Sequence, residues 1–300
     1  MRSQETKKEK LQRFATAFKE RMGDAEIGIS SSAIAYYLLL SIFPLMIALG
    51  NLLPLLKIDP ETMLGYLRIA IPPTVFELLE GTIRNLLENS SGGLLSISAV
   101  TTLWAASKSI NALSLALNKA YGLAKTRNMV ISRILSFFII FGLMMMVVAV
   151  TVVFTLGQTI IDYLTPYFPV IASFSDKFGT LKWPGILITL FITMLLIYTL
   201  LPNAKLKWRS IIPGTLFATV SWMLLTQLFG YYAKYFASSF SSYGIIGSFI
   251  IVMLWFNFAA SVIIIGGILN ASTEEYSTGE IQVRESVFHD VKKKMQKNED

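Results

Sequence analysis

The feature that most limits the fold is a series of six long apolar blocks separated by charged segments. A helix needs about 20 apolar residues to cross a hydrocarbon layer about 30 Å thick. Strands are disfavoured because the apolar runs are continuous, and in lipid each helix satisfies its own backbone. We therefore predict an all-α polytopic membrane bundle of six transmembrane helices. The predicted spans are residues 27–53, 94–117, 134–161, 185–201, 211–233 and 245–269.

The composition removes several classes of enzyme. Apolar residues make up 54% of the 300 and charged residues only 15%, whereas soluble domains average about 25% charged. There is no cysteine, and the single histidine, His289, lies in a polar tail. Metal-dependent phosphodiester cleavage needs clustered carboxylates or histidines, but the acidic residues are scattered through loops and tails. We expect no catalytic residue, no metal site, no cofactor and no ribonuclease or other enzymatic activity.

The basic residues indicate how the helices are oriented. Of 26 Lys and Arg, 19 lie in the N-terminal segment, the second and fourth connections and the C-terminal tail. Six lie in the other three connections, and Lys108 is left inside a span. Basic loops stay on the cytoplasmic side, so we predict a bacterial inner-membrane protein with both termini in the cytoplasm. The net charge of +7 then reflects topology, and we expect no nucleic-acid partner.

The chain divides into three predicted parts. Residues 1–26 form a basic amphipathic cytoplasmic segment, 27–270 the transmembrane domain, and 271–300 a polar cytoplasmic tail that we expect to be solvated. Within 8–23, apolar residues at helical spacing alternate with basic ones. Such a helix either lies on anionic headgroups or packs against the protein.

A second amphipathic helix is predicted at residues 73–89, in the long connection after the first span. Its apolar and charged residues fall on opposite faces. The helix either covers the outer end of the bundle or lies flat on the membrane. The apolar face consists of Phe76, Leu79, Ile83 and Leu86, and the charged face of Glu77, Glu80, Arg84 and Glu88.

The second span carries a polar stripe. In LWAASKSINALSLALNKAYG, residues 103–122, Lys108, Asn111 and Asn118 share an arc of roughly 100° with Thr101 and Trp104. A charge at the membrane centre costs about 2.5–3.5 kcal/mol on insertion scales, so the helix should be central, with the stripe facing protein or water. Two interpretations stay open. Either Lys108 binds an anionic substrate oriented by the two amides, or Lys108 reaches outward to the surface while the amides serve packing.

Four further polar residues inside spans complete the candidate substrate-binding set. They have the side chains to bind a substrate, but each also has an ordinary packing interpretation. These residues are Tyr36, Tyr37, Gln227 and Asn257.

Four segments resemble the YihY/virulence factor BrkB family of bacterial membrane proteins. The resemblance implies a six-span inner-membrane protein. Members have carried a ribonuclease BN label regarded as a misassignment, and others have been linked to serum resistance or envelope lipid transport. No catalytic or ligand residues come with it. The segments are AIAYYLLLSIFPLM (33–46), the 103–122 stretch, PGTLFATVSWMLL (213–225) and YGIIGSFIIVMLWFNFAASVIIIGGILNA (243–271).

Taken together, the sequence favours a transporter or exporter of a lipid or amphiphilic organic anion. No GxxxxGK[ST] motif is present, so transport would not use an ATPase of the chain's own. The alternative is a non-transporting scaffold or envelope-biogenesis factor. Expected partners are the bilayer, its anionic headgroups and an anionic or amphiphilic substrate. The sequence does not indicate an oligomeric state.

Overall fold

The computed structural model describes residues 7–56, 59–70, 73–88, 95–123, 172–241, 245–279 and 281–283, with single positions between 138 and 167. Apart from one pair of two-residue strands, all of its regular structure is helical, which confirms the predicted all-α class. The elements are α1 (Lys7–Asp24), α2 (Ile27–Leu56), α3 (Pro60–Ala70), α4 (Pro73–Glu88), α5 (Leu95–Ala120), α7 (Ala172–Leu200), β1 (Ala204–Lys205), α8 (Trp208–Ser241), α9 (Ile245–Thr278) and β2 (Gln282–Val283).

Five of the predicted spans fall on the helices α2, α5, α7, α8 and α9. Within the described residues, three segments are long and apolar enough to cross a membrane: Ile27–Ile47, Trp208–Tyr232 and Phe249–Thr278. A shorter apolar segment runs from Pro184 to Leu200. The third predicted span, 134–161, lies outside the described residues except at Phe138, Gly142 and Ile161.

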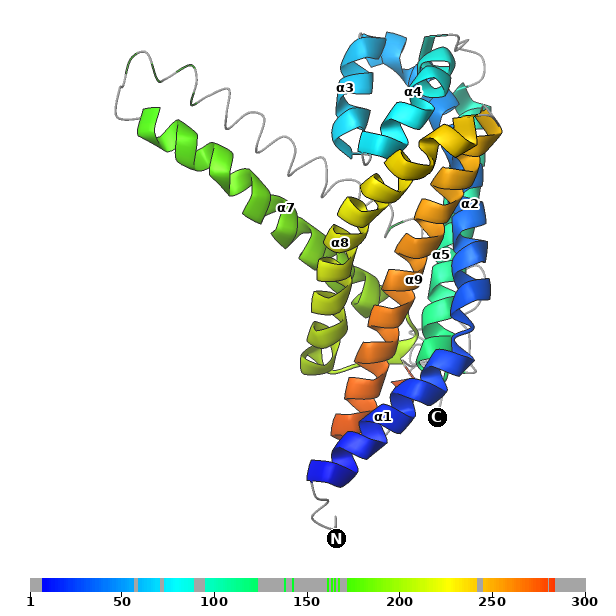
Figure 1. The fold of residues 1–300 in the computed structure, drawn as a ribbon, viewed down its shortest axis with the longest axis vertical. Coiled ribbons are helices and arrows are strands. Elements are labelled where there is room, and N and C mark those ends of the chain that lie inside the picture. Colours follow the sequence, from blue (N-terminus) through cyan, green and yellow to red (C-terminus); the bar gives the residue numbers. More distant parts are fainter. Residues whose placement is uncertain are drawn as a thin grey trace, which may run out of the picture.

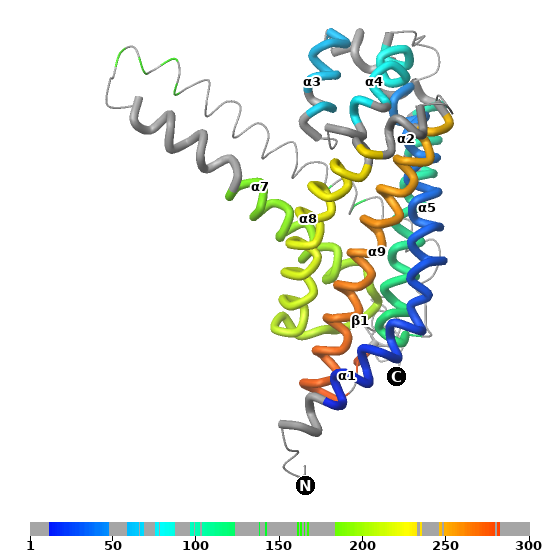
Figure 2. Tube along the Cα trace, viewed as in Figure 1, coloured from blue at the N-terminus to red at the C-terminus, as the bar shows by residue number. Residues whose placement is uncertain are grey.

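The long helices pack as an up-and-down bundle (Figure 1). α2 lies against α5 and α9, α9 lies against α8, and α8 lies against α7. One end of the bundle brings together α1, the ends of α5, α7 and α9, and the start of α8; we call it the junction end (Figure 2). The other end carries α3 and α4, and we call it the cap end. This alternation places the end of α5, with Lys119, and the basic connection 202–210 at the same end as α1.

Small side chains let the central helices approach closely. Ser31 and Ala35 on α2 are fully buried, and so are Ala105, Ser109 and Ala116 on α5. Residues of this size at helix interfaces allow backbones to come together where the hydrophobic effect is absent. The α2–α5 pair is therefore a packing unit.

α8 and α9 approach each other closely at Gly214. A Cβ placed on Gly214 would lie 1.9 Å from the carbonyl oxygen of Gly266. Beside it, Tyr198 of α7 donates a hydrogen bond to the carbonyl oxygen of Ile263 at 2.7 Å. Only a residue without a Cβ fits at Gly214, so this crossing point fixes how α8 sits on α9.

The two amphipathic segments both pack on the protein. α1 lies along the end of α9, with the Phe14 ring edge-on to Tyr276 and Ala17 buried, which is the second of the two alternatives left open for it. α4 packs on α2, α8 and α9. Its Phe76, Leu79 and Ile83 are buried in a cluster with Trp255 and its neighbours, so α4 covers one end of the bundle.

The last helix continues beyond the predicted boundary at residue 270. α9 runs to Thr278, with Ala271, Ser272 and Glu274 buried. After it, β2 pairs antiparallel with β1, Ala204 opposite Val283 and Lys205 opposite Gln282. The charges at 274 and 275 interrupt the apolar pattern without ending the helix, because both carboxylates have partners at the junction end.

Candidate functional site

Lys108 lies at the midpoint of α5. The helix runs from Leu95 to Ala120, so at 1.5 Å per residue Lys108 is roughly 20 Å from either end. Its side chain is half-buried, and its ammonium group sits 5.6 Å from the centroid of the Trp104 ring. That distance is within the range of a cation–π interaction. Among the residues that the structure describes, no carboxylate forms an ion pair with Lys108.

The polar stripe and the packing face lie on different sides of α5. Trp104 is 49% exposed and Leu115 40% exposed, while Lys108 and Asn111 are half-buried. The face that packs against α2 and α9 is instead made of buried small and apolar residues. They are Ser98, Ala105, Ser109, Leu113, Ala116, Leu117 and Ala120. The stripe therefore does not point into the α2–α5–α9 core, although α5 itself is well packed.

An ion pair fixes the level of Lys108 relative to α2. Lys119 pairs with Glu26, just before the antiparallel α2 begins. Eleven residues make about three helical turns and return to nearly the same face. Lys108 lies eleven residues before Lys119, and Tyr37 eleven after Glu26, so the two lie at about the same level. The rings of Tyr36 and Tyr37 meet edge-on with their centroids 5.3 Å apart, and Tyr36 is 52% exposed.

Asn118 has a structural partner far away in sequence. Its Oδ1 accepts the backbone N–H of Asn203 at 2.7 Å, and the residue is buried. One turn earlier, Ser114 donates to the carbonyl oxygen of Leu201 at 2.9 Å. These two contacts tie α5 to the end of α7 and account for the Asn118 amide without a ligand. Asn118 therefore links helices and does not share a role with Lys108 and Asn111.

The other two candidates are not brought together with Lys108. Asn257 on α9 donates from Nδ2 to Ser32 Oγ on α2 at 2.9 Å, which links those helices. Gln227 is exposed on α8, a helix whose main contacts are with α9 and α7. Five of the seven predicted residues lie on the paired helices α2 and α5, but Asn118 is engaged by Asn203. The other four are Lys108, Asn111, Tyr36 and Tyr37.

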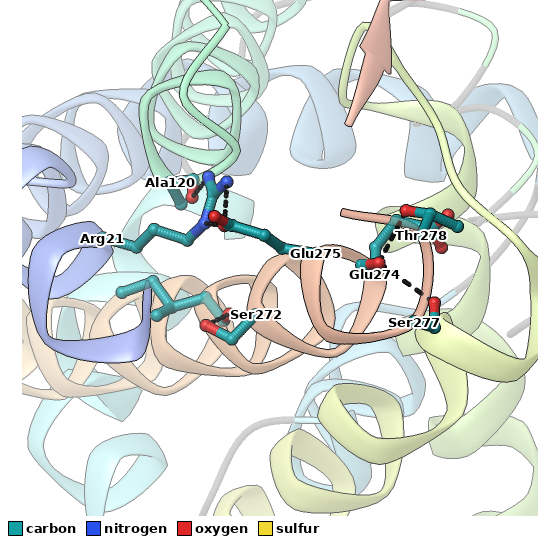
Figure 3. Close-up of polar contacts among 8 residues, drawn as sticks. Arg21, Ala120, Ser272, Glu274, Glu275, Ser277 and Thr278 are labelled. Atoms are coloured by element: carbon teal, nitrogen blue, oxygen red, sulfur yellow. Dashed lines mark hydrogen bonds and ion pairs between the residues drawn. The ribbon is translucent and has the colours of Figure 1, made fainter. Parts of the chain in front are cut away.

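A polar cluster lies at the junction end, and its centre is Arg21. The guanidinium donates to the carbonyl oxygen of Ala120 at 2.9 Å and to one oxygen of Glu275 at 2.7 and 3.0 Å (Figure 3). Its side chain is only 13% exposed. Ala120 ends α5, where carbonyl oxygens lack helical partners. Arg21 therefore joins α1, α5 and α9 in a single contact.

Glu274 performs a similar task for α8. It is buried, and its carboxylate accepts the backbone N–H of Lys207 at 3.0 Å, immediately before the helix begins at Trp208. A carboxylate is favoured there because the first N–H groups of a helix are unpaired and carry partial positive charge. Ser277 and Thr278 in turn donate to the Glu274 carbonyl oxygen in the last turn of α9 (Figure 3).

Two buried polar side chains stand beside this cluster. Asn270 accepts the N–H of Gly214 at 2.7 Å. Burial raises the pKa of the Tyr121 phenol well above its ordinary value of 10, and nearby Asn270 and Arg21 lower it by less. Tyr121 therefore stays neutral across the physiological range. Within the described residues, neither Tyr121 Oη nor Asn270 Nδ2 has a hydrogen-bond partner.

One signal at this cluster was available in the sequence. Gly122 has a φ of +67° and follows the end of α5. The N–H groups of Gly122 and Leu123 bond back to the carbonyl oxygens of Lys119 and Asn118, the pattern of a Schellman C-cap. The Tyr-Gly pair after the polar stripe thus marks where the helix ends. The partners of Arg21 and Asn118 had no such local signal.

The described residues contain no group of three or more His, Asp or Glu side chains placed to hold a metal ion. The clusters at both ends instead pair carboxylates with guanidinium groups or backbone N–H groups. What the arrangement offers chemically is electrostatic binding at Lys108 and mechanical linkage at the junction end.

The chain is similar to a family model and to several known proteins. The family model for virulence factor BrkB matches residues 18–287. A protein of Bacillus subtilis (strain 168), YfkH, whose name describes it as ribonuclease-like, is 31% identical over 80% of this chain and 88% of its own length. A UPF0761 membrane protein of Pseudoalteromonas translucida is 25% identical over 83% and 81%, and one of Idiomarina loihiensis 24% identical over 88% and 91%. No solved structure matches.

The family model covers nearly the whole chain, including the segments on which the sequence resemblance rested. Two of these relatives are named as membrane proteins, in agreement with the apolar helices of the bundle. The chain is therefore a membrane protein that belongs to the virulence factor BrkB family.

Proposed function

We propose that the protein is a six-span transporter or exporter of a lipid or amphiphilic organic anion in the bacterial inner membrane, with both termini cytoplasmic. The observation that carries the proposal is Lys108, a cation at the midpoint of a long packed helix. Among the described residues it has an aromatic ring beside it but no carboxylate partner. Ionisable residues at membrane depth are rare and usually serve a substrate or ion pathway.

The surroundings of Lys108 favour an amphiphile over a small hydrophilic anion. Apolar side chains on the same side of α5 are exposed, among them Ile97 and Val100 at 65% and 67% and Leu115 at 40%. An anionic headgroup at Lys108 would have these side chains on both sides of it along the helix. An attached hydrocarbon chain could lie against them and be removed from water at about 25 cal/mol per Å². A fully hydrated anion would gain nothing from them.

Flux through purified protein in liposomes tests the proposal. Fluorescently labelled phosphatidylglycerol, with dithionite added outside, reports movement between leaflets. We expect Lys108→Met to slow it roughly 10- to 100-fold, since hydrogen bonds to charged groups contribute about 1.5–3 kcal/mol. Lys108→Arg keeps the charge and should retain most of the flux.

The outcomes separate transport from the alternative of a scaffold. If wild-type protein moves neither the labelled lipid nor labelled fatty acids and organic anions, the scaffold is favoured. If wild type moves the lipid and Lys108→Met does so equally fast, the protein transports but Lys108 is not part of the site. Unchanged elution of Lys108→Met on size exclusion establishes that a slower flux is not due to unfolding.

The six-span topology has its own test, made simple by the absence of cysteine from the sequence. Single cysteines can be placed at Thr126, before the third predicted span, and at Tyr163, after it. A membrane-impermeant maleimide added to intact spheroplasts should label Tyr163→Cys and spare Thr126→Cys. Equal labelling of both positions would contradict both the third span and the proposed orientation.

The name of YfkH makes ribonuclease the second candidate. The one histidine in the sequence is His289, so two histidines cannot act together within a single chain. We expect purified protein with labelled RNA and Mg²⁺ or Mn²⁺ to show no cleavage above a mock preparation. Cleavage that co-elutes with the protein and is lost in an inactive variant would establish an enzyme instead.

A further inference from the structure

The start of α8 exposes a compact group of three cations and an aromatic ring. Lys205, Lys207 and Arg209 are all exposed, and Trp208 between them is 66% exposed. We call these four residues the α8 start patch. They lie within five consecutive positions at the junction end, where β1 passes into α8 (Figure 2).

Glu274 and Glu275, two described carboxylates at the junction end, are engaged elsewhere. Glu274 accepts the backbone N–H of Lys207 and is buried, so it caps the helix instead of pairing with a side chain. Glu275 is held by Arg21. Within the part of the chain that the structure describes, none of the three cations of the patch forms an ion pair. Their charge is available to an anion from outside.

The backbone beneath the patch is held in place. Lys205 is paired with Gln282 in the β1–β2 ladder, and the N–H of Asn203 is bound by Asn118. Ser210, which follows the patch, is buried. A ligand would therefore meet three cations on a fixed turn, and less entropy would be lost on binding.

An exposed apolar stripe leads from the patch along α8. An exposed apolar residue recurs at every fourth position. Because four residues slightly exceed one turn of about 3.6, the stripe winds gradually around the helix as it leaves the patch. Its residues are Ile212 at 48%, Leu216 at 55%, Val220 at 46%, Leu224 at 54% and Leu228 at 64%. Trp208 stands at the head of this stripe, where the apolar surface meets the charges.

We propose that the α8 start patch binds the headgroup of an anionic phospholipid, with the acyl chains along the stripe from Ile212. Tryptophan settles at the boundary between headgroups and hydrocarbon, and basic residues there attract anionic lipids. A phosphodiester offers oxygens to Lys205, Lys207 and Arg209 at once. An acidic protein would use the charges but leave the apolar stripe uncovered. This site is distinct from Lys108 and stands whether or not the protein transports.

The test titrates phosphatidylglycerol into full-length protein in dodecyl maltoside and measures lipid-bound protein by native mass spectrometry. Each cation near an anionic surface contributes roughly fivefold, so K205Q/K207Q/R209Q should bind about 100-fold more weakly. K292Q/K293Q/K294Q removes the same charge from the tail and should bind like wild type. Phosphatidylcholine should bind weakly and equally to all three proteins.

Several results would overturn the site. They are equal phosphatidylglycerol affinity in wild type and K205Q/K207Q/R209Q, an equal loss in the tail variant, displacement of the lipid by millimolar inorganic phosphate, or preferential binding of polyglutamate. The last would point to an acidic protein partner. If the triple variant fails to purify, K205Q and R209Q separately should each weaken binding roughly fivefold, and no loss in either would also reject the proposal.

Discussion

The two ends of the bundle are held together by different kinds of contact. At the junction end, side chains far apart in sequence bind buried backbone groups: Arg21 to Ala120, Asn118 to Asn203, and Asn270 to Gly214. At the cap end, α4 is held by apolar burial around Phe76 and Trp255. Its charged contacts, such as Arg84 with Glu61, are exposed.

This difference implies different tolerance to change. A buried polar contact has a narrow geometry, and removing one partner leaves the other unsatisfied at a cost of about 1–3 kcal/mol. Apolar packing is less directional, and exposed ion pairs contribute only about 0–1 kcal/mol each. We infer that the junction end fixes the helices relative to one another, whereas the cap end can loosen without disturbing them.

The largest effect should come from Gly214→Ala at the junction end. The new Cβ would lie 1.9 Å from the Gly266 oxygen, a backbone atom, so α8 and α9 must separate. We expect the free energy of unfolding to fall by more than about 3 kcal/mol, with loss of a monodisperse peak on size exclusion. Gly65→Ala in α3 is the matched control, because nothing lies within 4 Å of its Cβ. A Gly214→Ala protein as stable as the control would contradict the fixed crossing.

The next largest effect should come from Phe76→Ala at the cap end. Phe76 is 1% exposed, and the Arg68 guanidinium lies 5.2 Å from its ring centroid. Truncating a buried Phe costs about 3 kcal/mol or somewhat more. We expect faster hydrogen exchange in α3 and α4 and unchanged exchange in α1 and the end of α9. If exchange rises equally at both ends, the ends are not independent.

Arg21→Met should lower the free energy of unfolding by less than Phe76→Ala, and its effect should fall at the junction end. It removes the cation from Glu275 and from the end of α5 while keeping an apolar side chain. The Arg21–Glu275 pair is partly exposed. The loss of stability should therefore fall between the values for surface and buried ion pairs, at about 2 kcal/mol. Hydrogen exchange should rise in α1 and stay constant in α4. A double-mutant cycle with Glu275→Gln would reveal no coupling if the contact were incidental.

The comparison of ends also shows what the sequence could predict. The cap end follows from local pattern, because Phe76, Leu79 and Ile83 of the predicted apolar face are buried. Leu87, which was not predicted for this face, is buried as well. Only Leu86, predicted for this face, is half-buried. The positions of the apolar helices follow from length and hydropathy in the same way, whereas the depth of Lys108 does not.

The junction end could not be predicted because its contacts join distant positions. Arg21 and Glu275 are 254 residues apart and Asn118 and Asn203 85 apart, so no periodicity relates them. From the sequence alone, Asn118 groups with Lys108 because the two residues share one arc of a helix. A shared arc does not reveal that Asn118 faces the end of α7, whereas Lys108 lies beside exposed side chains.

The smallest effect is a pH response confined to the cap end. The hydrogen bond from Arg84 lowers the pKa of Glu61 below its ordinary value of 4.5, and the nearby charges of Arg84 and Arg68 act in the same direction against partial desolvation. A lowered folded-state pKa stabilises the contact above the unfolded pKa, and that stabilisation is lost as pH falls through the folded value. A spin label on Thr62→Cys should therefore become more mobile only below about pH 4.5. Glu61→Gln should remove the step and leave the label equally mobile throughout, because the neutral amide does not attract Arg84. A step that survives Glu61→Gln would place the titrating group elsewhere, and an accompanying change in α1 would couple the two ends after all.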